Sequence, residues 1–131
     1  MKLITKTSVL SIVLTTSLLA AGALAQKGKS IVTRIKFERG RTTAAYLGTV
    51  HRGVSHDYLL EARSGQSMSV HLAAAGGVCF DLYTPGLAEQ LANCSKDWSG
   101  ELPAAGDYRI NVLPDTTTER NIAYTLEVTV R

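Results

Sequence analysis

The chain has 131 residues, 45% of them hydrophobic and 19% charged, which is enough for one modest core and one domain. Its formal net charge is +3, and removing the two lysines near the start lowers this to +1. No run of Lys or Arg is interleaved with aromatic residues. This pattern excludes a typical nucleic-acid-binding surface, so we expect no nucleic-acid partner.

The first 25 residues are typical of a secretory signal peptide. Two lysines give a positive start, residues 9–25 are apolar and uncharged, and small residues occupy the positions that a signal peptidase reads. We predict cleavage between Ala25 and Gln26, with a signal peptide over 1–25 and a single domain over 26–131. An uncleaved anchor is the alternative, but the apolar stretch is short for a spanning helix, which needs about 20 residues. We therefore expect a periplasmic or secreted protein without membrane insertion after cleavage.

The rest of the chain alternates apolar and polar residues with a period of two, which is typical of strands. In the first predicted strand the alternation places Ile31, Ile35 and Phe37 on one face. The segment 87–98 is the least regular and favours either one helical turn or a weak strand. Turn residues separate the alternating segments, so we predict an all-β fold, an antiparallel β-sandwich of seven to eight strands. The clearest predicted strands are 31–38, 44–51, 56–62, 67–73, 78–83, 107–113 and 122–130.

A compact turn precedes the strand that contains Tyr108. Pro103 fixes its own φ, and Gly106 can take a positive φ without steric cost. We predict a rigid corner at one end of the sandwich. The ring of Tyr108 should lie in the core and its hydroxyl should reach a backbone partner near the turn.

Cys79 and Cys94 are the only cysteines, and both lie in the part predicted to be exported. An even number of cysteines in an oxidising compartment favours a disulfide, with two free thiols as the alternative. Closing a loop of about 15 residues adds roughly 3 kcal/mol in the chain-entropy model. Neither cysteine has a second Cys or His at ligand spacing, so we expect no metal site.

Signatures of catalysis are lacking in the sequence. There is no G-x-S-x-G, H-E-x-x-H, phosphate-loop or calcium-loop motif. Ser55, His56 and Asp57 have the composition of a triad, but adjacent residues of a strand point to opposite faces and cannot converge. We therefore expect no enzyme activity and no cofactor.

The segments "FERGRTTAAYLGTV", "DYLLEARSGQSMSVHL", "VCFDLYTPG", "GELPAAGDYRINVL" and "AYTLEV" together resemble the bacterial pre-peptidase C-terminal type of β-sandwich. Within that group the chain is most similar to the periplasmic inhibitors of g-type lysozyme, over nearly all of 32–130. The matching positions are mainly turn glycines and core aromatic residues, which are specific for the fold.

The resemblance implies a function and a set of contacts. In the inhibitors, two arginines between the last two strands and polar residues before the third strand are expected to enter the lysozyme cleft. Arg120 matches the second arginine, and Thr117 takes the place of the first. We therefore predict an exported inhibitor of a cell-wall hydrolase of the g-type lysozyme kind. The predicted target-binding residues are Arg120, Glu119, Asp115, Asp57 and His56.

A generic envelope sandwich that binds carbohydrate or protein is the alternative function. It would present an exposed strip of aromatic residues on a sheet face, whereas an inhibitor would present charged loop tips at one end. The chain has few aromatic residues beyond those expected in the core, which favours the inhibitor. The sequence leaves the oligomeric state open.

Overall fold

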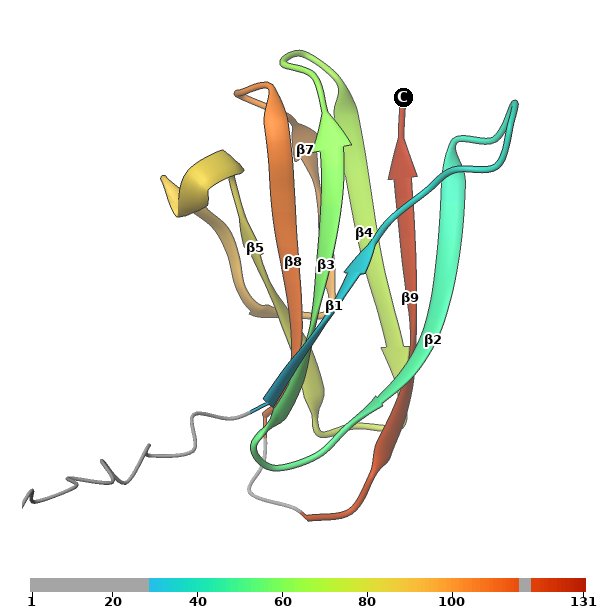
Figure 1. Cartoon of the computed structure of the whole chain (residues 1–131), viewed down its shortest axis with the longest axis vertical. Helices are drawn as coiled ribbons and strands as arrows, with labels where there is room; N and C mark the ends of the chain where they lie inside the picture. Colours follow the sequence, from blue (N-terminus) through green and yellow to red (C-terminus); the bar gives the residue numbers. More distant parts are fainter. Residues whose placement is uncertain (1–28, 116–118) are drawn as a thin grey trace, which may run out of the picture.

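The computed structural model describes residues 29–115 and 119–131, and it confirms the predicted β-sandwich (Figure 1). Nine strands form a five-stranded and a four-stranded sheet. Between β5 and β6 lies a single short 3₁₀ turn, η1 (Pro85–Leu87). The strands are β1 (Lys29–Arg34), β2 (Thr43–Val50), β3 (Val54–Ala62), β4 (Ser67–Ala74), β5 (Val78–Tyr83), β6 (Gln90–Ser95), β7 (Asp97–Glu101), β8 (Gly106–Pro114) and β9 (Ile122–Val130).

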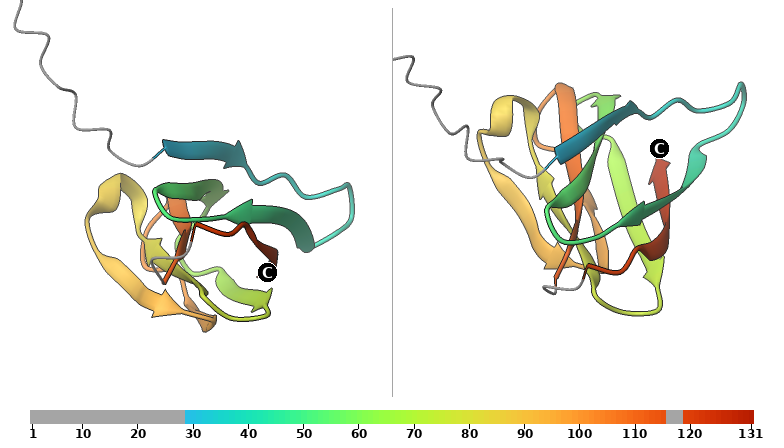
Figure 2. Two further views of the ribbon diagram at one scale, coloured as in Figure 1. Left: turned by 90° about the horizontal axis from the view of Figure 1, so that it is seen from below. Right: turned by 60° about the horizontal axis from the view of Figure 1, so that its bottom comes forward.

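The order of strands is β1-β3-β8-β5-β6 in the first sheet and β2-β9-β4-β7 in the second. Figure 2 shows the two sheets facing each other. The chain passes from one sheet to the other at every connection except the one from β5 to β6. Neighbouring strands are antiparallel except β1 and β3, which run parallel. This pair departs from the predicted antiparallel arrangement because the chain crosses to the other sheet between β1 and β3.

The inward side chains of both sheets form one core, as the alternation predicts. The largest are Tyr58, Tyr108 and Phe80, each fully buried. Apolar side chains of this size each contribute about 1.5–3 kcal/mol when they leave water. The other buried residues of the alternating segments include Ile35, Leu60, Ala62, Met68, Val70, Leu72, Val78, Leu82, Ile110, Val112, Tyr124, Leu126, Val128 and Val130.

Two segments differ from the sequence prediction. The first strand ends at Arg34 rather than at residue 38, and Ile31, expected inside, is 48% exposed. As an edge strand, β1 has a neighbour on one side only, so its apolar side chains are poorly covered. The irregular segment 87–98 holds β6 and the start of β7, which raises the strand count to nine.

The corner before β8 has the predicted geometry. The hydroxyl of Tyr108 donates a hydrogen bond to the carbonyl oxygen of Ala104 at 2.6 Å and accepts one from its N–H at 3.1 Å. Gly106 has a φ of 133°, a value that favours glycine. A Cβ there would lie 2.9 Å from the ring of Pro85 in η1. The corner is therefore held by its own backbone and by a neighbouring turn.

The predicted disulfide is present between Cys79 of β5 and Cys94 of β6, across a sequence separation of 15. The N–H of Cys94 also donates to Oδ1 of Asp81 at 2.7 Å. The two strands shift register twice along their pairing, so backbone hydrogen bonds alone hold β6 weakly. The disulfide fixes this edge strand to the sheet.

Candidate functional site

One end of the sandwich gathers the β2–β3 turn (51–53), the β4–β5 turn (75–77) and the described residues of the β8–β9 connection (115 and 119–121). We call these segments the loop end; Figure 1 shows them together at the bottom of the molecule. The N–H of Asp115 donates to the carbonyl oxygen of Gly77 at 2.9 Å and so ties two of the segments together. Strands of the packed core lead into every segment of the loop end.

The β2–β3 turn projects Arg52. It is closed by a 2.8 Å hydrogen bond from the N–H of Val54 to the carbonyl oxygen of His51, and Gly53 has a φ of 76°. An Nη1 atom of Arg52 lies 3.8 Å from Oε1 of Glu119, and the two side chains are 65% and 84% exposed. An ion pair this exposed contributes little to folding. Both side chains are consequently available to a partner.

Three of the five predicted target-binding residues lie at the loop end. Asp115, Glu119 and Arg120 are all exposed there. Thr117 lies outside the described residues. Arg52 is a functional candidate that the sequence did not predict, although it lies between the predicted strands 44–51 and 56–62. Its place at the tip of a tight turn was the available signal.

The resemblance implied that His56 precedes the third strand, in a loop. In the structure it lies inside β3, and its ring is turned toward the other sheet. Its Nε2 lies 2.7 Å from Oγ1 of Thr33, and its Nδ1 lies 2.9 Å from the hydroxyl of Tyr124 and 3.2 Å from that of Tyr58. The imidazole also stacks on the ring of Tyr58, with ring centroids 4.2 Å apart. Burial lowers the pKa of His56, and the nearby charge of Asp57 partly opposes the shift.

The hydroxyls of Tyr58 and Tyr124 are 2.6 Å apart and join β3 of one sheet to β9 of the other. Burial is the main cause that raises the pKa of both phenols, so both stay neutral. A Cβ on Gly48 of β2 would overlap the hydroxyl of Tyr124. This cluster of His56, Tyr58, Tyr124 and Thr33 is a polar bridge between the sheets, and it lies close beneath the loop end.

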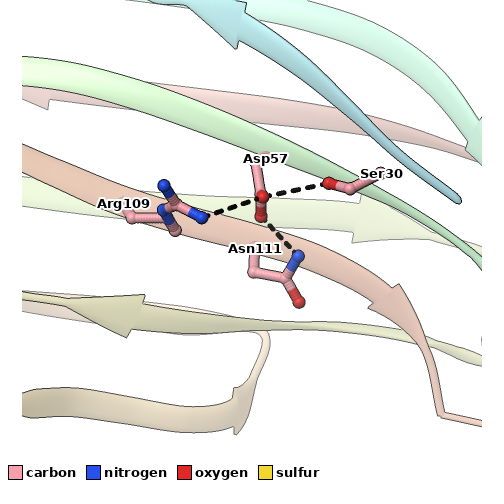
Figure 3. Close-up of polar contacts among 4 residues, drawn as sticks. All are labelled: Ser30, Asp57, Arg109 and Asn111. Carbon is pink, nitrogen blue, oxygen red and sulfur yellow. Dashed lines mark hydrogen bonds and ion pairs between the residues drawn. The ribbon is translucent and has the colours of Figure 1, made fainter. Parts of the chain in front are cut away.

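Asp57 lies on the opposite face of β3, as expected for a residue next to His56. Its Oδ2 accepts hydrogen bonds from Ser30 at 2.9 Å and Arg109 at 3.2 Å, and its Oδ1 accepts one from Asn111 at 2.5 Å (Figure 3). Asp57 is only 7% exposed, so the three donors replace the water that it loses. Asp57 therefore holds β1, β3 and β8 together on the outer face of the five-stranded sheet.

The outer face of the four-stranded sheet carries a shallow hollow of about 450 Å³ near the loop end. Most of its lining residues are small, and Leu47, with 82% of its surface exposed, stands at its border.

Within residues 29–115 and 119–131, one cluster has the composition of a metal site, formed by Cys79, Cys94 and Asp115. Its two sulfur atoms are bonded to each other, so they are not free to bind a metal. In the same described part of the chain, no helix has the length and apolar character needed to cross a membrane.

No protein-family model and no curated protein matches this sequence. Solved structures, in contrast, share the type of β-sandwich that the sequence resemblance implies. The pre-peptidase C-terminal domain of a Bacillus anthracis collagenase aligns with a TM-score of 0.52 and 11% identity, over 79% of this chain and 95% of that chain. The chain therefore shares the β-sandwich fold of a pre-peptidase C-terminal domain.

The structures of PliG, a periplasmic inhibitor of g-type lysozyme, are more similar. The protein from Aeromonas hydrophila aligns with a TM-score of 0.70 and 25% identity, over 79% of this chain and 98% of that chain. The protein from Salmonella Typhimurium aligns with a TM-score of 0.64 and 24% identity, over 77% and 98% of the two chains. These alignments confirm the resemblance seen in the sequence.

Proposed function

We propose that this protein is an exported inhibitor of a g-type lysozyme, or of a similar cell-wall hydrolase, and that it acts in the periplasm. The observation that carries the proposal is the loop end, where Arg52, Arg120 and Glu119 are exposed on segments held by the core. The similarity to PliG from Aeromonas hydrophila supports it, because that alignment covers 98% of an inhibitor.

The chemistry of the loop end suits a lysozyme cleft. Such a cleft contains a catalytic carboxylate, and a guanidinium can bind a carboxylate with two parallel charge-assisted hydrogen bonds. Two guanidinium groups extend from two different turns at this end, Arg52 and Arg120. We infer that Arg52 supplies the second cation where Thr117 replaces the first arginine of the inhibitors.

The five predicted target-binding residues then divide into two roles. Arg120, Glu119 and Asp115 contact the target directly. His56 and Asp57 act from within β3, where His56 joins the sheets beneath the loop end and Asp57 anchors β1 and β8. Loops whose ends are fixed by such contacts lose little conformational entropy when they bind a partner, which favours binding.

The test is inhibition of a g-type lysozyme by the exported protein and by two variants, Arg120→Ala and Arg52→Ala. Each variant is expected to weaken inhibition by about 1.5–3 kcal/mol, the range for a hydrogen bond to a charged group. Arg63→Ala is the matched control, because Arg63 is an exposed arginine in the β3–β4 turn at the opposite end. The same inhibition assay with a c-type lysozyme measures the specificity of the inhibitor.

Absence of inhibition at micromolar protein would contradict the proposal and favour the generic envelope sandwich. Inhibition that is insensitive to both arginine variants would retain the function but discard the loop end as the binding surface. If Arg63→Ala weakens inhibition as much as Arg52→Ala and Arg120→Ala do, the binding surface is not confined to the loop end.

A further inference from the structure

The exposed edges of the two sheets are protected very unequally. The edges are β1 and β6 in one sheet and β2 and β7 in the other. Natural proteins protect such edges with charges, bulges or short strands, because an open edge is a template for another strand. β1 carries Arg34, β6 has two register shifts, and β7 is five residues long with an acidic residue at each end.

β2 has none of these protections. Its eight residues, TAAYLGTV, include no charge and no proline, and its pairing with β9 runs without a shift over the whole strand. Figure 1 shows β2 at the side of the molecule, beyond β9. Leu47, the fifth residue of the strand, is 82% exposed, more than any other large hydrophobic residue that the structure describes.

The pairing with β9 fixes which backbone groups of β2 point outward. The N–H of Val130 donates to the carbonyl oxygen of Thr42, directly before the strand. Hydrogen-bonded pairs alternate along an antiparallel ladder, so Ala44, Tyr46 and Gly48 bond to β9. The N–H and C=O groups of the intervening residues point away from the sheet. The intervening residues are Thr43, Ala45, Leu47 and Thr49. Their outward backbone groups make no hydrogen bond to another residue in the described part of the chain.

The space beside this edge differs between the two halves of the strand. The loop 36–41 flanks the first half of β2, where the N–H of Lys36 donates to the hydroxyl of Tyr46 at 2.9 Å. Between that loop and Thr43–Tyr46 lies a hollow of about 430 Å³. The second half of the strand, from Leu47 to Val50, is not among the residues that line this hollow.

We propose that β2 is an interaction surface for a second copy of this chain, which adds its own β2 antiparallel across a two-fold axis. An uncharged strand can face its own copy without repulsion, which the charged edges β1 and β7 cannot. A C₂ interface requires such a self-complementary surface. One register pairs all four outward-pointing residues with one another and forms about eight hydrogen bonds.

In that register Thr43 lies opposite the second copy's Thr49, and Ala45 lies opposite the second copy's Leu47. Each large side chain therefore packs against a small one on the outer face, and Leu47 becomes covered. On the inner face Ala44 lies opposite the second copy's Gly48, and Tyr46 lies opposite the second copy's Tyr46 on the two-fold axis. Because the two β2 strands run in opposite directions, the two loop ends point away from each other. Both remain accessible, so the dimer is independent of the proposed inhibition.

The experiment measures the molar mass of the protein, purified after export, by sedimentation from micromolar to millimolar concentration. The wild type is expected to form a concentration-dependent dimer. Leu47→Lys places a charge on the edge, and Ala45→Pro removes an outward N–H that β9 does not use. Both variants are expected to be monomeric. Ser69→Lys, on the outer face of β4 away from the edge, is the control and is expected to remain dimeric.

The register has its own test. Ala45→Cys and Leu47→Cys are expected to form a disulfide with each other when mixed, and much less when either is alone. Hydrogen-bonded strand pairs have Cα atoms about 5.5 Å apart, within the range that a disulfide spans. A wild type that is monomeric at every concentration would overturn the proposal. A strand of a different protein would then be the remaining candidate partner for β2. A dimer that survives both edge variants, or that Ser69→Lys alone disrupts, would also overturn it.

Discussion

The two ends of the sandwich use their side chains in opposite ways. At the corner end, Tyr108 is fully buried, and both of its hydroxyl hydrogen bonds go to the backbone of Ala104. At the loop end, Arg52 and Glu119 are more than half exposed, and their closest charged atoms are 3.8 Å apart. The corner stabilises the fold, whereas the loop end contributes little stability and keeps charged groups in water. This division separates the residues needed for folding from those available for binding.

The largest expected effect is at the corner. Tyr108→Ala should destabilise the protein by about 3–5 kcal/mol, because it leaves a cavity in the core and two backbone groups without their partner. Tyr108→Phe keeps the ring and should cost about 1 kcal/mol. Urea unfolding followed by fluorescence measures both. A free energy of unfolding unchanged by Tyr108→Ala would contradict the role of the corner.

The disulfide should contribute almost as much. Replacing Cys79 and Cys94 together by alanine should cost roughly 3 kcal/mol, because the unfolded chain regains the freedom of a loop of about 15 residues. Comparing the oxidised wild type with the double variant in urea gives this value. Equal midpoints would show that β6 is held by its backbone pairing instead.

His56 should make stability depend on pH. Burial lowers the pKa of His56 in the folded state, so below about 6.5, the ordinary pKa of histidine, the unfolded chain binds more protons. Stability is therefore complete above that pH and falls as the pH drops toward the pKa of the folded state. Urea unfolding at a series of pH values should show this decrease for the wild type and a smaller one for His56→Gln. His71→Gln is the control, because the side chain of His71 is 57% exposed. The idea fails if His56→Gln and the wild type have the same pH dependence.

The smallest expected effect is at the loop end. Glu119→Ala and Arg52→Ala should each change the free energy of unfolding by no more than about 0.5 kcal/mol, as for other exposed side chains. Thermal unfolding beside the inhibition assay separates stability from binding. A large loss of stability in either variant would remove the contrast between the two ends.

Local patterns in the sequence predicted most of the fold. The alternation of apolar residues predicted the inward side chains, the Pro103 to Gly106 turn predicted the corner, and the cysteine count predicted the disulfide. Ile31 was placed wrongly, because alternation assigns a face but does not show that the strand lies at an edge. The parallel pairing of β1 with β3 is likewise a property of the crossover between sheets and not of local sequence.

The candidate site was predicted less completely because its contacts are long-range. Arg52 and Glu119 meet only because the β2–β3 turn and the β8–β9 connection reach the same end. The resemblance placed His56 and Asp57 in a loop, although the alternation alone predicted correctly that they face opposite sides of a strand. Their partners, Tyr124 for His56 and Asn111 for Asp57, come from strands distant in the sequence.

In the proposed inhibition, a guanidinium of the loop end binds the catalytic carboxylate of the target. A double-mutant cycle tests this contact, with calorimetry of the wild type and Arg120→Ala against a g-type lysozyme and against its variant in which an amide replaces the catalytic carboxylate. The two changes are expected to be coupled, by about 1.5–3 kcal/mol for a charged hydrogen bond. Binding losses that add within about 0.5 kcal/mol would contradict it, since they would place Arg120 away from the catalytic carboxylate.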